Sequence, residues 1–285
     1  MKTNRFNPFL QIILLVLVGT FIGCKNQSVD DRLDPRIVKI DSLEKAGFEI
    51  IDLHAHLKGG LTMEQLLDHS QKTGISYGVA VNCGVGFPID NDSALSAYYH
   101  EVKNYEVFHA MQAEGREWLT IFSPDSIDLF DYVFTDAMTF FDAKGRRTRL
   151  WIREEVFIED ADSFMEYYVT QIVEILNNEP IDIYVNPTFL PQQIADRYDE
   201  LWTPDRMQRV ILALRENEIA MEINSRYKIP SAGFIKRSKE AGVKFTMGTN
   251  NGGSELGYLE YGLKMIEECG LNPDDFWKPV RKQIQ

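Results

Sequence analysis

The sequence predicts an α/β protein whose parallel strands close into a barrel with helices on the outside. Short runs rich in β-branched and aromatic residues alternate with longer runs of helical periodicity, which indicates parallel strands joined by crossover helices. Each strand-like run is apolar through its middle, as expected for a parallel strand covered on both faces. Each run also ends in polar side chains, and in an α/β barrel these strand ends converge on one face. An open doubly wound sheet is the alternative architecture.

The elements follow one another in regular order along the chain. The predicted strands are residues 49–56, 77–82, 107–114, 132–136, 181–186, 219–224 and 244–250. The predicted helices are residues 63–72, 94–104, 164–177, 204–217, 232–241 and 255–268. The polar residues that close the strands are His54 and His56, Asn82, Glu114, Asp136, Asn186, Glu222 and Asn224, and Asn250. A single polar strand end is ordinary turn chemistry, but one at every strand indicates a shared site.

The N-terminus carries an export signal. Lys2 and Arg5 precede an apolar run at residues 12–22 that is too short to span a bilayer comfortably. Gly23-Cys24 follows and resembles the bacterial lipoprotein box, which implies a signal peptide at residues 1–23 and a lipid on Cys24. A polar tether at residues 24–36 then leads to one barrel domain at residues 37–285. We expect an exported protein held to a bacterial membrane only by this lipid; a plain cleaved signal with an incidental cysteine is the alternative.

The charge and the cysteine content of the sequence indicate which kinds of partner and of covalent crosslink to expect. The formal charge is −13 with no long basic run, which argues against nucleic acid and favours a small-molecule substrate. Cys83 and Cys269 are the other two cysteines and form no disulfide framework. The stretch between residues 138 and 162 is long for a loop and carries the basic run at residues 144–149. It is predicted to be a hairpin that turns at Gly145 and covers the barrel mouth, or else a solvated surface loop.

The sharpest motif is DLHAH at residues 52–56. Residues two apart on a strand share a face, so His54 and His56 can grip one cation while Ala55 points away. Neutral imidazole suits zinc, manganese or iron. The alternative is a pair of hydrogen-bonded structural histidines.

Two carboxylates are the next candidate ligands and catalytic groups. Glu114 and Asp136, with the histidines, would form a mixed nitrogen and oxygen site that leaves positions open for substrate. Lys58 is a third candidate catalytic residue because it follows the histidines directly and supplies positive charge. Alternatively, Glu114 pairs with Arg116 and Asp136 caps a turn.

Further residues near the strand ends are candidate substrate-binding groups. Gly59-Gly60 would let backbone N–H groups approach an anion beside Lys58. Arginines in this position clamp phosphate or carboxylate in a fork. The predicted substrate-binding set is Lys58, Arg116, Asn186, Glu222, Asn224, Arg226 and Asn250. Alternatively, Gly59-Gly60 is a flexible loop that binds no ligand, and the arginines form ion pairs with Glu114 and Glu222.

The DLHAH strand and the C-terminal segment from residue 222 to residue 271 resemble the PHP family (polymerase and histidinol phosphatase domains). The resemblance implies a distorted seven-stranded TIM-like barrel that uses metal ions to hydrolyse phosphate esters, with His54, His56, Glu114 and, less securely, Asp136 as ligands. This chain departs from the family where Asn186-Pro187 replaces His-Pro and where Thr249-Asn250-Asn251-Gly252 replaces Ser-Asp-x-His. Asparagine is a weak neutral ligand, so one or two divalent transition ions are expected instead of a full cluster.

We therefore expect a metal-dependent hydrolase that acts on a phosphate ester or a related small polar substrate, possibly derived from a sugar. Two alternatives remain open, since a fold does not fix a function. One is a barrel lyase, isomerase or glycan-related enzyme with a reduced metal site. The other is a surface lipoprotein that binds ligands without catalysis.

Overall fold

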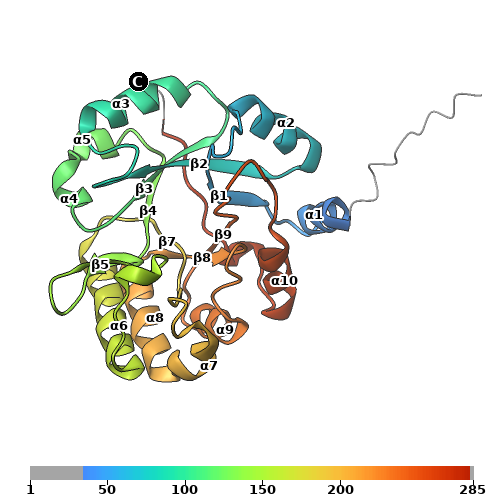
Figure 1. The fold of residues 1–285 in the computed structure, drawn as a ribbon. Helices are drawn as coiled ribbons and strands as arrows, with labels where there is room; N and C mark the ends of the chain where they lie inside the picture. The colour runs from blue at the N-terminus through green and yellow to red at the C-terminus, as the bar shows by residue number, and fades with distance from the viewer. Residues whose placement is uncertain (1–34, 283–285) are drawn as a thin grey trace, which may run out of the picture.

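The predicted closed barrel is confirmed in the computed structural model, which describes residues 35–282 (Figure 1). Seven parallel strands are hydrogen-bonded in the order β1-β2-β3-β4-β7-β8-β9, and β9 returns to β1. They are β1 (Ile51–Ala55), β2 (Ser76–Cys83), β3 (Phe108–Ala113), β4 (Tyr132–Thr135), β7 (Ile183–Tyr184), β8 (Ala220–Asn224) and β9 (Phe245–Gly248). The seam between β1 and β9 has a single register pair, Asp52 with Met247. Cys24 and the predicted signal lie outside the described residues.

Helices surround the barrel on its outer face (Figure 1). They are α1 (Pro35–Lys45), α2 (Met63–Thr73), α3 (Asp92–Val102), α4 (Trp118–Ile121), α5 (Pro124–Ile127), α6 (Ala161–Asn178), α7 (Tyr198–Leu201), α8 (Pro204–Glu216), α9 (Ala232–Glu240) and α10 (Glu260–Glu268). The six predicted helices correspond to α2, α3, α6, α8, α9 and α10, whereas α1, α4, α5 and α7 were not predicted. None of the helices within residues 35–282 is long and apolar enough to cross a membrane.

Local capping explains where the longer helices begin. A side-chain oxygen accepts a backbone N–H of the first turn at the start of α2, α3, α6, α8 and α9, which satisfies a donor that the helix itself cannot pair. The capping residues are Thr62, Asn91, Asp160, Thr203 and Ser231.

The barrel interior has its own apolar cluster, separate from the larger core between strands and helices. Ile51, Leu53 and Phe134 belong to it, and Trp277 packs against it. The Tyr132 hydroxyl donates to the Leu53 carbonyl oxygen at 2.7 Å inside the barrel. The interior is therefore packed with side chains, and an active site can form only at an end.

A register irregularity in β1 aims the histidines. Ile51 and Leu53 face the barrel interior, and simple alternation would place Ala55 there too. The pairing with β2 shifts between Asp52 and Ala55, and Ala55 packs in the outer core instead. His54 consequently turns inward, with its ring centroid 4.7 Å from that of Phe134.

The predicted hairpin is confirmed as the pair β5 (Thr139–Phe141) and β6 (Arg147–Arg149), which are antiparallel. Gly145 has the left-handed φ of 73° that its turn requires. The basic side chains of the hairpin each have an acidic partner. These pairs are Lys144 with Glu159, Arg146 with Asp142, Arg147 with Glu117, and Arg149 with Glu155. Such pairing agrees with the surface-loop alternative for the basic run; a lid function stays a prediction.

Glycine substitutions test the packing of the barrel interior. A side-chain carbon at Gly78 would lie 2.0 Å from the Tyr132 hydroxyl and 3.0 Å from Leu53. We expect Gly78→Ala to lower the free energy of unfolding by about 1–3 kcal/mol through overpacking. Gly233→Ala is the control. Gly233 lies in α9, and the atom nearest to an added side-chain carbon, Ser231 Oγ, would be 3.9 Å away. This substitution should stabilise the protein by less than about 1 kcal/mol. Urea unfolding of both variants measures the difference; equal stabilities would contradict this packing.

Candidate active site

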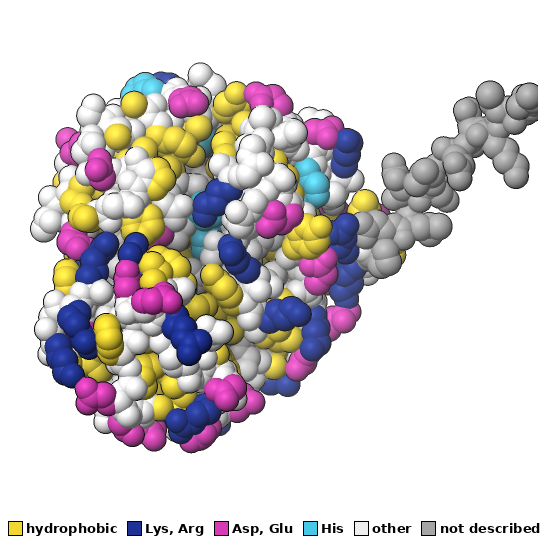
Figure 2. Space-filling model, in the orientation of Figure 1, with side chains coloured by type: hydrophobic (Ala, Val, Ile, Leu, Met, Phe, Trp, Pro, Cys, Tyr) yellow, Lys and Arg dark blue, Asp and Glu magenta, His cyan; other side chains and the backbone are white. Residues whose placement is uncertain are grey.

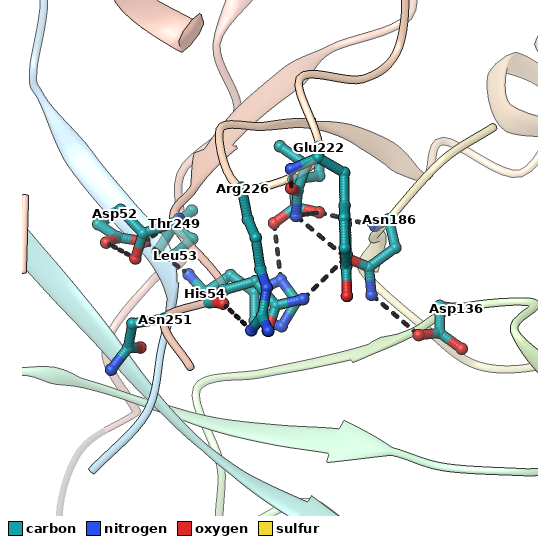
Figure 3. Close-up of polar contacts among 12 residues, drawn as sticks. Asp52, Leu53, His54, Asp136, Asn186, Glu222, Arg226, Thr249 and Asn251 are labelled. Carbon is teal, nitrogen blue, oxygen red and sulfur yellow. Dashed lines mark hydrogen bonds and ion pairs between the residues drawn. The ribbon is translucent and has the colours of Figure 1, made fainter. Parts of the chain in front are cut away.

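Six of the polar strand-end residues form one hydrogen-bonded group at the carboxyl end of the barrel, namely His54, Asp136, Asn186, Glu222, Asn224 and Asn250 (Figure 3). The histidines come from the end of β1, Glu222 and Asn224 from β8, and Asn186 from the residues just after β7. All of these side chains are buried. The expectation that residues far apart in the sequence meet at this face is confirmed for this group.

Both histidines form a hydrogen bond through Nδ1 and leave Nε2 without a partner. His54 Nδ1 lies 2.7 Å from Glu222 Oε1, and His56 Nδ1 lies 2.9 Å from the Ala80 carbonyl oxygen. Each acceptor takes a hydrogen bond from the proton on Nδ1, and an imidazole that carries its proton there when neutral has a free lone pair on Nε2. Both Nε2 atoms are buried and have no hydrogen-bond partner. Burial, followed by the positive charges of His54, Lys58 and Arg226, lowers the pKa of His56 well below its usual value, so this imidazole stays neutral.

Glu222 fixes the orientation of His54. Its Oε2 accepts the Asn186 backbone N–H at 2.7 Å and the Asn224 side-chain amide at 3.0 Å, so the carboxylate is held from both sides. Gly248 leaves room for it, because a side-chain carbon there would lie 2.0 Å from Glu222 Oε1. Glu222 was predicted to bind substrate, but this arrangement is that of a group that positions a histidine.

Asn186 is the centre of the network. Its side-chain nitrogen donates to Asp136 Oδ2 at 2.9 Å, and its Oδ1 accepts from Asn224 at 3.0 Å and from Asn250 at 2.9 Å. Its φ of 48° lies in the left-handed region, which asparagine tolerates better than most residues. Asn186 and Asn224 were predicted to bind substrate. Their side-chain amides instead form hydrogen bonds with other protein groups, which favours a structural role.

Glu114 and Asp136 are fully buried carboxyl groups that influence each other. Burial, followed by the charge of Asp136, raises the pKa of Glu114 to about 8. Asn82 donates to Glu114 Oε1 at 2.7 Å, whereas Oε2 is buried without a partner. The pKa of Asp136 is raised, chiefly by burial, and its Oδ1 accepts the Met138 N–H at 2.9 Å. Asp136 therefore also has the turn-capping role that the sequence left open.

The donor set fits a metal ion only in part. The two free Nε2 atoms and the unpartnered Glu114 Oε2 are the atoms expected of ligands. Within residues 35–282, however, no three or more His, Cys, Asp or Glu side chains lie close enough to hold an ion together. The prediction that His54, His56, Glu114 and Asp136 converge on one coordination sphere is thus not met by this arrangement. The histidines are the part of the site that fits a metal.

Two of the three predicted cationic groups lie at the mouth. Lys58 and Arg226 act on each other and on His56 through their charges, and burial lowers the pKa of Lys58. Figure 2 shows Lys and Arg side chains beside histidine in the hollow at the centre of this face. Arg116 is different: it donates to Glu179 Oε1 at 2.7 Å and to Thr135 Oγ1 at 2.9 Å. Arg116 was predicted to bind substrate, with an ion pair to Glu114 as the alternative; its ion-pair partner is instead Glu179, which favours a role in the fold.

Sequence reasoning assigned no role to Thr249 or Asn251, which join β9 to β1. Thr249 donates to Asp52 Oδ2 at 2.6 Å, and the Asn250 N–H donates to the His54 carbonyl oxygen at 2.8 Å. Asn251 accepts the His56 N–H at 2.7 Å and donates to the His56 carbonyl oxygen at 2.8 Å. The only signal was their adjacency to Asn250, which gives no partner.

No protein-family model matches the sequence, and no curated protein matches it. Among solved structures, the chain is similar to histidinol phosphate phosphatase from Lactococcus lactis subsp. lactis Il1403, whose structure was determined with zinc, L-histidinol and phosphate. The TM-score is 0.54 at 14% identity, over 79% of this chain and 95% of that chain. At this identity the likeness shows the fold, a closed barrel like that of the family that the sequence motifs resemble.

The Asn186 side chain can be removed without straining its backbone. We expect Asn186→Gly, which keeps the left-handed φ, to cost about 2–4 kcal/mol of folding stability because buried Asp136, Asn224 and Asn250 lose their common partner. Asn250→Gly is the matched control with φ of 43° and a single side-chain bond in this network, and it should cost about 1 kcal/mol. Chemical denaturation measures both; equal losses would remove Asn186 from the centre of the network.

The raised pKa of Glu114 makes stability depend on pH in the metal-free protein. Between the usual glutamate pKa of 4.5 and about 8, the unfolded chain releases this proton while the folded protein keeps it. Stability should therefore fall as pH rises across this window. Glu114→Gln should flatten the fall, whereas the exposed control Glu106→Gln should not. Thermal unfolding of chelator-treated protein between pH 5 and pH 8 tests this, and parallel curves for all three proteins would refute it.

Proposed function

We propose that this protein is a hydrolase of a phosphate ester or a related anionic ester, and that it works with one divalent transition ion at the carboxyl end of the barrel. The observation that carries the proposal is the pair of buried imidazoles whose Nδ1 atoms are bonded to acceptors and whose Nε2 atoms have no hydrogen-bond partner. A buried polar atom without a partner costs free energy, so two of them side by side indicate a ligand. The resemblance of the DLHAH motif to the PHP family and the phosphatase fold support the reaction class.

Different residues of the chain would bind the metal ion, bind the substrate anion and transfer a proton. His54 and His56 would hold the ion through Nε2, and the ion would supply Lewis acidity at the reacting oxygen. Lys58 and Arg226 offset the negative charge of the substrate at the mouth. Burial beside Asp136 raises the pKa of Glu114 in the metal-free protein, so Glu114 is the candidate to hold a proton and give it to a leaving group from Oε2. Glu222 keeps the His54 ring in place.

Metal content is the first test. We expect His54→Ala and His56→Ala to reduce the affinity for Zn²⁺ at least tenfold and to abolish hydrolysis of p-nitrophenyl phosphate. Glu222→Gln should weaken Zn²⁺ binding less, since it alters only the support of His54. The exposed His100→Ala variant is the control and should match the unmodified protein. Elemental analysis and Zn²⁺ titration provide a readout independent of activity; unchanged Zn²⁺ binding in both histidine variants would overturn the proposal.

A non-catalytic anion-binding barrel is the second candidate. It is favoured by the lack of a three-donor group within residues 35–282 and by the use of asparagine amides inside the network. Phosphate binding without hydrolysis at any supplied transition metal would select this candidate.

The cellular setting is part of the proposal. The Gly23-Cys24 junction supports a lipid-anchored protein on the outer side of a bacterial cytoplasmic membrane or beyond it. The short polar stretch after Cys24 would keep the barrel close to that membrane.

A further inference from the structure

A pocket opens beside the candidate active site. Its volume is about 430 Å³, and it lies between the residues that follow β8 and those that follow β9. Its lining includes Arg226, Lys228, Asn250, Gly252 and Glu255. Arg226 and Asn250 also belong to the mouth described above, so the two sites adjoin.

One carboxylate of the protein occupies the donors of this pocket. The backbone N–H groups of Gly252 and Gly253 both donate to Glu255 Oε1, each at 3.2 Å. Successive N–H groups that point at one oxygen form the concave anion site known as a nest. The Glu255 carboxylate lies directly against the glycine segment, since a side-chain carbon at position 253 would be 2.7 Å from Glu255 Oε2.

Arg226 completes the donors of the pocket. Its guanidinium lies against Gly252, where a side-chain carbon would be 3.1 Å from Nη1 and 3.2 Å from Nη2. Nη1 also donates to the Asn250 carbonyl oxygen at 2.9 Å, which fixes the guanidinium beside the nest. The pKa of Glu255 is lowered by its own backbone N–H, by those of Gly252 and Gly253, and by Arg226, so an ionised group occupies the donors.

The donors are held in place, whereas their occupant is not. Asn251 ties the glycine segment to His56 and also donates to the Gly253 carbonyl oxygen at 2.7 Å. A side-chain carbon at Gly59 would lie 2.8 Å from the Ser254 nitrogen, so the Lys58 loop packs directly against the same segment. Glu255 is a solvent-exposed side chain and can turn into water at little cost.

We infer that the N–H groups of Gly252 and Gly253, together with Arg226, form a second oxyanion subsite, which Glu255 occupies in the free protein and a phosphate or carboxylate group of the substrate occupies on binding. The substrate class is then a polar ester that carries a second anionic group away from the reacting one. The ester part of this statement rests on the proposed function; oxyanion binding in the subsite does not.

Binding of inorganic phosphate is measured in a His54→Ala background, which removes the proposed metal-dependent part of phosphate binding at the candidate active site. Calorimetric titration should show that adding Glu255→Ala lowers the Kd about tenfold, equivalent to about 1.4 kcal/mol, because the internal competitor is gone. Glu260→Ala is the matched control: it removes a second exposed carboxylate from the same pocket, one with no bond to the glycine N–H groups. Adding Arg226→Ala to the Glu255 variant should raise the Kd at least tenfold. Circular dichroism confirms that each exposed-site variant is folded.

Equal phosphate affinities in the Glu255 and Glu260 variants would overturn the inference, as would phosphate binding that ignores Arg226. A parallel titration with acetate identifies the source of the oxyanion: tighter phosphate binding supports a phosphate group and tighter acetate binding a carboxylate, whereas failure of both to bind the Glu255 variant refutes the subsite. Hydrolysis by the unmodified protein is scored separately. A protein that binds phosphate here but hydrolyses nothing refutes only the proposed function, and an active protein without the Glu255 effect refutes only the subsite.

Discussion

The contact between Glu222 and His54 is the constraint on which the rest of the site depends. Glu222 Oε1, at the end of β8, lies 2.7 Å from His54 Nδ1 on β1. Its Oε2 accepts hydrogen bonds from the Asn186 backbone N–H and the Asn224 side-chain amide. A carboxyl group buried this deeply needs hydrogen-bond partners for both oxygens, since a buried polar atom without a partner costs free energy. The surrounding asparagines satisfy it, and the His54 proton is fixed as a consequence.

Asparagine gives this site a different electrostatic balance from one built on carboxylates and histidines. The amides of Asn186, Asn224 and Asn250 link β7, β8 and β9 through hydrogen bonds without adding charge. Glu114 and Asp136 already raise each other's cost of ionisation, and further carboxylates would add to it. A neutral network lets the strand ends come together without several cations to compensate them.

Much of the fold could be predicted because its signals are local. Apolar runs that end in polar residues located all seven strands, and periodicity located five long crossover helices and α10 after the last strand. The one-turn helices α4, α5 and α7 are too short for a periodic pattern, and α1 follows a tether that looks merely polar. The candidate site could be predicted in membership but not in roles. Whether Asn186 meets substrate or Asp136, and whether Arg116 pairs with Glu114 or Glu179, depends on contacts between residues far apart in the chain. Asn251 and Asp52 were missed for the same reason.

The seam between β1 and β9 ties the assembly of the site to the order in which the chain is made. The two strands share one register pair, and the remaining links are made by site residues: Asp52 with Thr249, His54 with Asn250, and His56 with Asn251. Residues 56 and 251 are 195 positions apart, so these links form late and carry a large loop-closure cost. During synthesis β1, with the histidines, emerges first, and its contacts to the residues after β9 can form only when that last strand has been made. A nascent or truncated chain would therefore present the two histidines without the contacts to residues 250 and 251 that hold their backbone.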